Sequence, residues 1–226
     1  MIKKVIILNL ETTTKNCSVA VSANGQLLAL KEINEGSYAH AEFLNPFVEE
    51  VLQTAGLQFS DVSAVAISKG PGSYTGLRIG VSAAKGLCFA LDIPLIAIET
   101  LEIIAKSIQI SQGFIVPMLD ARRMEVYRAI YDAQYNVIHP TDAVVITSDT
   151  FDALLEMGEV HFVGDAVEKV KPLIAHPNAV FHENTFPSAQ DLCVPAYQRF
   201  LENTFEDVAY FEPYYLKDFI AVKKSI

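Results

Sequence analysis

The sequence predicts an α/β protein of two similar lobes, each with a mixed β-sheet. In the first half, apolar runs and helical periodicity give three strands, then a helix, a strand, a helix, a strand and a helix. From Phe114 the opening pattern begins again, and an acidic residue closes the first strand of each half, Glu11 and Asp120. The interval from that acid to the next turn is 13 positions in both halves, to Asn24 and to Ala133. These features indicate the duplicated actin-like ATPase (RNase H-like) fold, with two unrelated α/β halves as the alternative.

Local signals place the elements of the first half. Asn24-Gly25 is a strong hairpin signal between the second and third strands. Ser37 can cap the first helix and Gly56 can end it. A turn of two glycines and a proline follows the fourth strand, and helical periodicity then continues to Ala90. The expected strands span 5–10, 17–22, 26–33, 62–67 and 93–98, and the other two helices span 38–55 and 99–109.

The second half of the chain has weaker local signals. We divide the chain into a first lobe at 1–110 and a second lobe at 111–226, and the last segment is a candidate to return to the first lobe. Its expected strands span 114–119, 125–131, 137–139 and 161–163, with a last strand at Tyr214-Tyr215-Leu216. Its expected helical segments span 149–156, 165–175 and 188–203.

Composition limits the classes of partner and compartment. Seventeen basic and 27 acidic residues give a net charge of −10, which makes the chain a poor candidate for holding nucleic acid unaided. The cysteines, Cys17, Cys88 and Cys193, are odd in number and widely spaced, which is typical of a reducing compartment. The apolar start is too short for a signal peptide, and no run is long enough to span a membrane. We therefore expect a cytoplasmic protein with no membrane partner.

The glycine-rich loop between the fourth strand and the second helix is the most distinctive stretch. Its spacing excludes a P-loop, because Gly70 and Gly76 have five residues between them and Leu77 stands where lysine is required. It also excludes the dinucleotide fingerprint and the nucleophile elbow. Three interpretations remain open: a structural turn, a catalytic loop, or a cradle for phosphate or nucleotide formed by Gly70, Gly72 and Ser73 at a helix N-terminus.

The strand-end acids Glu11, with Thr12 beside it, and Asp120 could face a nucleotide and magnesium across a cleft between the lobes. Such acids also cap neighbouring turns, which is the alternative. The five histidines include no pair three to five residues apart, and the sequence has no paired-cysteine zinc motif. We therefore identify no metal site and no catalytic residue.

Two helices carry more apolar surface than one sheet requires. In the first, the apolar arc covers roughly 180°, whereas a helix on one sheet face needs about 100°. Phe43 and Phe47 lie at the surplus edge of that arc. In the second, Gly76, Gly80 and Ala84 form a smooth ridge at i, i+4 spacing. The pattern favours helices that also pack on a partner, with close packing of the two helices on each other as the alternative.

The chain resembles the bacterial TsaB (YeaZ) family over essentially its whole length. The motifs that carry the resemblance are Leu10-Glu11-Thr12 with Cys17-Ser18-Val19-Ala20, the block Gly70-Pro71-Gly72-Ser73-Tyr74-Thr75-Gly76-Leu77-Arg78-Ile79-Gly80, Leu119-Asp120-Ala121-Arg122-Arg123 with Glu125-Val126-Tyr127, and Glu212-Pro213-Tyr214-Tyr215-Leu216. The family usually has Asp where this chain has Glu11, a change that preserves the charge.

The resemblance implies an actin-like fold and a non-catalytic scaffold role in making N6-threonylcarbamoyladenosine (t6A) at position 37 of tRNAs that read ANN codons. The implied partners are the catalytic paralogue TsaD, in a heterodimer, and the ATPase TsaE, with tRNA bound only through the complex. The catalytic paralogue has a His-x-x-x-His metal pair where this chain has Thr100 and Ile104. No cofactor is certain, and ATP or ADP with magnesium at the complex interface is the candidate.

In this family the heterodimer contact is made by two helices of the first lobe, which can also self-associate, so a homodimer of the isolated chain stays open. The residues that we assign to this contact are Tyr38, His40, Phe43, Phe47, Leu77, Arg78, Gly80, Val81 and Ala84. A local basic patch at Lys217, Lys223 and Lys224 could add a tRNA contact. The alternative functions are a stand-alone nucleotide-binding ATPase and an M22-type peptidase.

Overall fold

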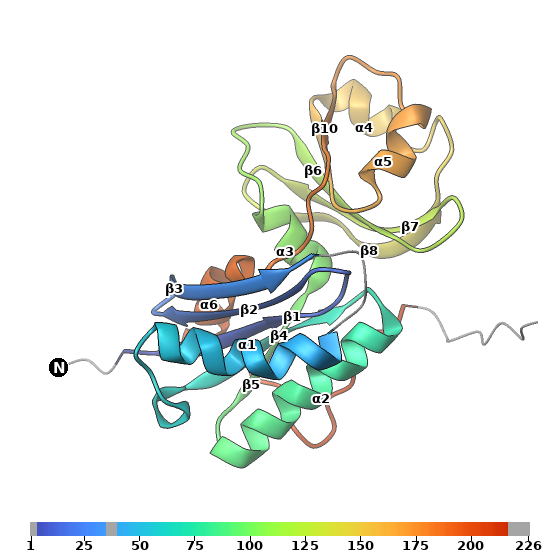
Figure 1. The fold of residues 1–226 in the computed structure, drawn as a ribbon. Coiled ribbons are helices and arrows are strands. Elements are labelled where there is room, and N and C mark those ends of the chain that lie inside the picture. Colours follow the sequence, from blue (N-terminus) through green and yellow to red (C-terminus); the bar gives the residue numbers. More distant parts are fainter. Residues whose placement is uncertain (1–3, 35–39, 217–226) are drawn as a thin grey trace, which may run out of the picture.

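The computed structural model describes residues 4–34 and 40–216, which form two five-stranded sheets with helices (Figure 1). The first sheet has the order β3-β2-β1-β4-β5, and the second has β10-β9-β6-β7-β8. In the first, β1 pairs antiparallel with β2 and parallel with β4; in the second, β6 pairs the same way with β7 and β9. The two sheets thus share one topology, which confirms the predicted duplication and the actin-like fold class.

The bounds of the elements follow the predicted ones closely in the first lobe. Its strands are β1 Ile6–Glu11, β2 Cys17–Ala23, β3 Gln26–Ile33, β4 Ala64–Gly70 and β5 Leu95–Glu99. Its helices are α1 His40–Thr54, α2 Tyr74–Leu91 and α3 Thr100–Lys106, with a 3-10 turn, η1, at Phe59–Asp61.

The second lobe differs more from the prediction. Its strands are β6 Phe114–Asp120, β7 Glu125–Asp132, β8 Val137–Val145, β9 Val160–Val163 and β10 Ala179–His182. Its helical elements are α4 Asp152–Met157, α5 Val167–Val170 and η2 Lys171–Leu173. The elements that follow, η3 Ala189–Leu192 and α6 Cys193–Leu201, pack on the first sheet. Strand β8 is longer than expected, and β10 was not predicted, because Ala179–His182 is short and has no alternation of buried and exposed residues.

Helices cover both faces of the first sheet (Figure 1). The alternation along β1 separates two cores: Leu8 and Leu10 pack under α1 and α2, whereas Ile7 packs under η3 and α6 from the far end of the chain. Helix α3 lies between the lobes, where Leu101 and Ile104 share a core with residues of β6 and β7. None of the described helices is long and apolar enough to cross a membrane.

Residues 206–216, which we call the C-terminal strap, run back along the first lobe. The main-chain N–H of Glu206 donates to the carbonyl of Leu95 (2.9 Å), and that of Tyr214 donates to the carbonyl of Lys69 (2.7 Å). Between these points the Lys85 ammonium group donates to the carbonyls of Ala209 (3.1 Å) and Phe211 (2.9 Å). The predicted strand at 214–216 is wrong, because this segment meets the sheet through single hydrogen bonds and forms no ladder.

Candidate functional site

A cleft of about 620 Å³ lies between the lobes, next to the carboxyl ends of β1, β4 and β6. Open α/β sheets bind their ligands at this end of the strands. The first lobe supplies Thr13, Thr14, Pro71, Gly72, Ser73, Tyr74, Thr75 and Leu77; the second supplies Leu119, Asp120, Ala121, Arg122, Tyr127 and Asp165; the strap supplies Tyr214, Tyr215 and Leu216. The cleft is therefore bounded by three separate parts of the chain.

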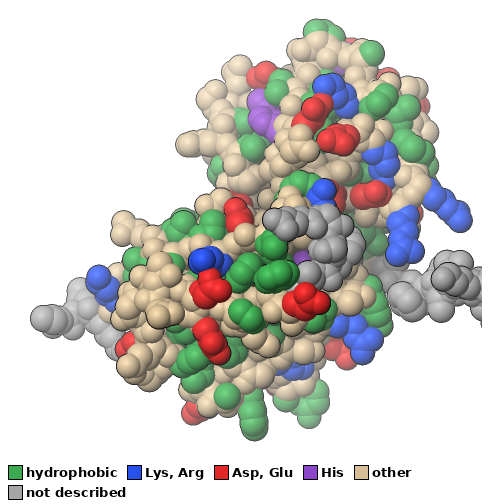
Figure 2. Space-filling model, in the orientation of Figure 1, with side chains coloured by type: hydrophobic (Ala, Val, Ile, Leu, Met, Phe, Trp, Pro, Cys, Tyr) green, Lys and Arg blue, Asp and Glu red, His purple; other side chains and the backbone are tan. Residues whose placement is uncertain are grey.

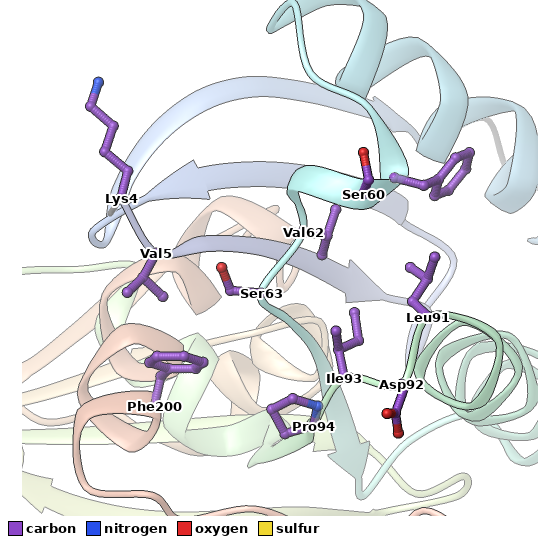
Figure 3. A pocket seen from close by; sticks show the side chains of 11 residues that line it. Lys4, Val5, Ser60, Val62, Ser63, Leu91, Asp92, Ile93, Pro94 and Phe200 are labelled. Carbon is purple, nitrogen blue, oxygen red and sulfur yellow. The ribbon is translucent and has the colours of Figure 1, made fainter. Parts of the chain in front are cut away.

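A second cavity, of about 470 Å³, lies at the opposite end of the first sheet (Figure 3). Val5, Ser63 and Pro94, each of which precedes a strand, form part of its lining. Its charged side chains are Lys4 and Asp92, which come from different segments of the chain. Because it lies at the amino ends of the parallel strands, we take the cleft between the lobes as the candidate site.

The glycine loop is packed against other parts of the chain. The N–H of Ser73 donates to the carbonyl of Thr13 (2.7 Å), and the Ser73 hydroxyl caps α2 by accepting from the N–H of Gly76 (3.3 Å). A Cβ at Gly72 would lie 2.6 Å from the Cβ of Thr13. Gly70 has a φ of +113°, and a Cβ there would lie 2.7 Å from the carbonyl oxygen of Tyr214. These glycines thus permit close contact with the β1–β2 loop and the strap.

Glu11 is completely buried beneath this loop and does not line the cleft. One carboxylate oxygen accepts from the Thr13 N–H (2.6 Å) and hydroxyl (2.5 Å), and the other accepts from the Ser68 hydroxyl. Burial raises the pKa of this carboxyl group above its usual value. Thr12 is also buried, and its hydroxyl donates to the carbonyl of Gly76 (2.8 Å). The Glu11 carboxylate therefore joins β1 to β4 and to the loop after β1, and the Thr12 hydroxyl joins that loop to α2.

Asp120, the equivalent acid of the second lobe, does line the cleft. Its carboxylate pairs with the Lys169 ammonium group (2.6 Å) and accepts from the N–H of Arg122 (2.7 Å). Its own N–H donates to Asp165, a half-buried residue whose pKa burial raises to about 6. Arg122 and Arg123 both have positive φ, +69° and +52°, in the tight turn that follows. The turn presents both arginines as exposed residues.

The cleft thus brings together three of the six residues expected to bind nucleotide, Gly72, Ser73 and Asp120. Arg122 and Asp165, which the sequence offered as possible ligand contacts or as parts of a turn and a helix cap, also line the cleft. The sequence reasoning missed the tyrosines of the lining other than Tyr74, which are Tyr127, Tyr214 and Tyr215. The motifs of the resemblance contained all three, but nothing in their spacing indicated that the strap and β7 meet at one cleft.

The structure corrects the predicted partner surface on α2. Leu77, Gly80, Val81 and Ala84 are all buried within the chain itself. A Cβ at Gly76 or Gly80 would collide with Thr12, which follows β1, so the small-residue ridge faces the first sheet and not a partner. The prediction of an outward ridge is wrong, because helical periodicity fixes which residues share a face but not what that face contacts. His40 of α1 is buried as well, next to Gly76.

The remaining assigned residues reach the surface. Arg78 is exposed, and Phe43 and Phe47 are half-buried one turn apart on α1, with ring centroids 5.6 Å apart. Tyr38 lies outside the described residues, as do Lys217, Lys223 and Lys224. Figure 2 shows the side of the molecule that carries α1 and α2, where hydrophobic side chains lie among charged ones. We call the exposed side of these two helices the α1/α2 face.

The described part of the chain contains no group of three or more His, Cys, Asp or Glu side chains that could hold a metal ion. Thr100, the first residue of α3, and Ile104, one turn later, are completely buried. They belong to the packing between the lobes and not to the cleft lining.

Comparisons with known proteins match the chain to a TsaD family model, to TsaB proteins and to YeaZ structures. Residues 34–224 match the family model described as TsaD, tRNA N6-adenosine threonylcarbamoyltransferase. The chain is 32% identical to the tRNA threonylcarbamoyladenosine biosynthesis protein TsaB of Escherichia coli, over 96% of this chain and 97% of that protein. It is also 32% identical to TsaB of Bacillus subtilis over 74% of each chain. Among solved structures, YeaZ from Pseudomonas aeruginosa superposes with a TM-score of 0.78 and 27% identity, over 95% of this chain and 100% of that one.

Proposed function

The chain belongs to the TsaB family, and on that premise we propose that it is a non-catalytic scaffold subunit of the complex that makes t6A in tRNA. The observation that carries the proposal is the similarity to curated TsaB proteins over nearly the full length of both chains. The cytoplasm, where tRNA is modified, is the compartment that this role requires.

The non-catalytic part of the proposal rests on the side chains present. Where the catalytic paralogue is expected to have a histidine pair, Thr100 and Ile104 are core residues. Asp120 is the strand-end acid that the cleft exposes, and Lys169 neutralises it. Glu11 has both oxygens occupied by Thr13 and Ser68. These donors do not fit a magnesium–nucleotide complex inside this chain, and we derive no catalytic step from them.

The partner that we propose is a TsaD-type paralogue, docked on the α1/α2 face, with a TsaE-type ATPase joining the pair. Of the assigned residues that the structure describes, Arg78, Phe43 and Phe47 can touch a partner directly. The buried ones, Leu77, Gly80, Val81 and Ala84, act by packing α2 against the first lobe. We propose that tRNA reaches this chain within the complex.

The test is nucleoside mass spectrometry of tRNA from cells depleted of this protein. We expect t6A to fall on depletion and to return with the wild-type chain but not with Arg78→Glu. Lys171→Glu, the same charge change at an exposed site in the second lobe, is the matched control and should restore t6A. An unchanged t6A level after depletion would refute the pathway assignment.

Two alternative functions are tested with the same purified protein. Cleavage of peptides by the isolated chain would support an M22-type peptidase, and steady ATP turnover would support an ATPase of the actin-like fold. The proposal predicts neither activity, together with saturable binding of the TsaD-type partner that Arg78→Glu weakens at least tenfold.

A further inference from the structure

The cleft has an aromatic wall. Tyr74 at the start of α2 packs against Tyr215 of the strap, with ring centroids 5.2 Å apart and planes inclined at 38°. The side chain of Tyr215 remains 39% exposed and lines the cleft. Tyr214 and the half-buried Tyr127 also line it. Tyr127 comes from β7 of the other lobe. Tyrosines from three parts of the chain therefore border one cavity, an arrangement suited to a flat aromatic ligand.

One arginine lines the cleft beside two aspartates, in a chain whose net charge is −10. Arg122 lines the cavity, and Arg123 follows it in the same exposed turn. Of the two aspartates at the cleft, Asp120 pairs with Lys169, and Asp165 is half-buried and accepts from the N–H of Asp120. A ligand that enters here therefore meets the exposed guanidinium group of Arg122.

The places where a polyphosphate would bind are filled by the chain itself. The carbonyl of Thr13 accepts a hydrogen bond from the N–H of Ser73, and Thr13 also packs against Gly72. The carbonyl of Tyr214, in the strap, packs against Gly70. The remaining space, about 620 Å³, is of ordinary size for a small organic ligand. It suits an aromatic ring with one phosphate better than a triphosphate with its metal.

We propose that the cleft binds one unpaired base of an RNA strand, stacked on the tyrosine wall, with an adjoining phosphate held by Arg122. Stacking on tyrosine and capture of the backbone by arginine are the two interactions that single-stranded RNA sites use. The proposal rests on the proposed function and deepens it, because it gives this chain a direct contact with unpaired nucleotides of its tRNA. A free nucleoside monophosphate shares the same chemistry, so the test includes it.

The test is fluorescence anisotropy of a labelled, unstructured RNA heptamer titrated with the purified full chain. We expect binding of the single strand, at least tenfold weaker binding of the same sequence as a duplex, and no competition from ADP with magnesium at equal concentration. Tyr127→Leu should weaken binding about tenfold and Tyr127→Phe should restore it, because the ring and not the hydroxyl stacks. Arg122→Gln should weaken binding and lower the slope of log affinity against log salt by about one.

Two controls separate the cleft from general attraction. Arg123→Gln, next to Arg122 but not in the cavity lining, should have the smaller effect, and so should the double change Lys223→Gln and Lys224→Gln. Any of four results would overturn the inference. They are equal binding of single strand and duplex, equal losses of affinity for the Arg122 and Arg123 variants, binding of AMP without binding of RNA, and no RNA binding at all. The t6A assay is independent: if wild type restores t6A and no RNA binds, this inference alone fails.

Discussion

The direction in which α2 presents its small residues can be decided by two glycine-to-alanine changes in that one helix. Gly80 faces inward: an added Cβ would collide with the Thr12 hydroxyl and lie 3.0 Å from Cδ1 of Ile67. Gly86, less than two turns later, has no atom within 4 Å of the added Cβ. Both changes reduce the conformational freedom that a glycine has in the unfolded chain, so each contributes about 1 kcal/mol of favourable free energy to the stability of the folded protein.

The remaining contributions separate the two variants. At Gly80, overpacking costs about 1–3 kcal/mol, and displacement of Thr12 from the carbonyl of Gly76 costs about 1 kcal/mol more. We therefore expect Gly80→Ala to lower the free energy of unfolding by about 1–3 kcal/mol. At Gly86 no steric clash opposes this gain, so Gly86→Ala should raise the free energy of unfolding by about 0.5–1 kcal/mol.

The assay is urea unfolding followed by circular dichroism, with both variants compared at equal m-value. In thermal melts the difference between them should amount to several degrees, given about 2–4 °C per kcal/mol for a chain of this size. If Gly80→Ala proved as stable as Gly86→Ala, the ridge would have to face away from β1. The outward orientation expected from the sequence would then be right and the packing described here wrong.

Two further predictions concern the strap and a buried acid. Lys85→Met should remove the hydrogen bonds to the carbonyls of Ala209 and Phe211. The rate of amide hydrogen exchange in 207–216 should then rise at least tenfold, while exchange in β1 stays unchanged. Equal exchange rates in the variant and the wild type would show that Lys85 does not hold the strap. Burial, and then the charges of Glu32 and Glu11, raise the pKa of Asp191 to about 7, so its contribution to stability is present at low pH and is lost as pH rises from about 4 to 7. Asp191→Asn should remove that loss, so at pH 8 the variant should be more stable than wild type by an amount of the order of 2 kcal/mol, with no such gain at pH 4. Urea unfolding at both pH values measures this difference. A difference that does not depend on pH would contradict the assignment.

The sequence was sufficient for the architecture because its signals are local. Apolar runs, the Asn24-Gly25 hairpin and the repeated acid-to-turn interval each depend on residues close in sequence, and together they predicted the strands of the first sheet and the duplicated fold. The strand-end position of Glu11 and Asp120 was also predicted correctly. Short elements with no periodicity, such as β10, gave no comparable signal.

The details of the site were harder to predict because they depend on contacts between distant residues. Burial of Glu11 follows from its partner Ser68, 57 positions away, and pairing of Asp120 follows from Lys169, 49 positions away. The cleft wall needs Tyr215 beside Tyr74. The inward orientation of Gly80 was hidden for the same reason: Thr12 belongs to another element, and no helical pattern records it.

The covering of the first sheet by η3 and α6 has a consequence for synthesis on the ribosome. The core that contains Ile7, Ala66 and Ile98 also contains Leu192 and Ala196, so it stays open to water until the last part of the chain has emerged. The strap, which closes against Lys69 and Leu95, arrives later still. A nascent first lobe of about 110 residues would expose one apolar sheet face, which makes it a natural client for chaperones. Slowing translation within the second lobe should lengthen that exposure and increase aggregation without any change in the finished protein.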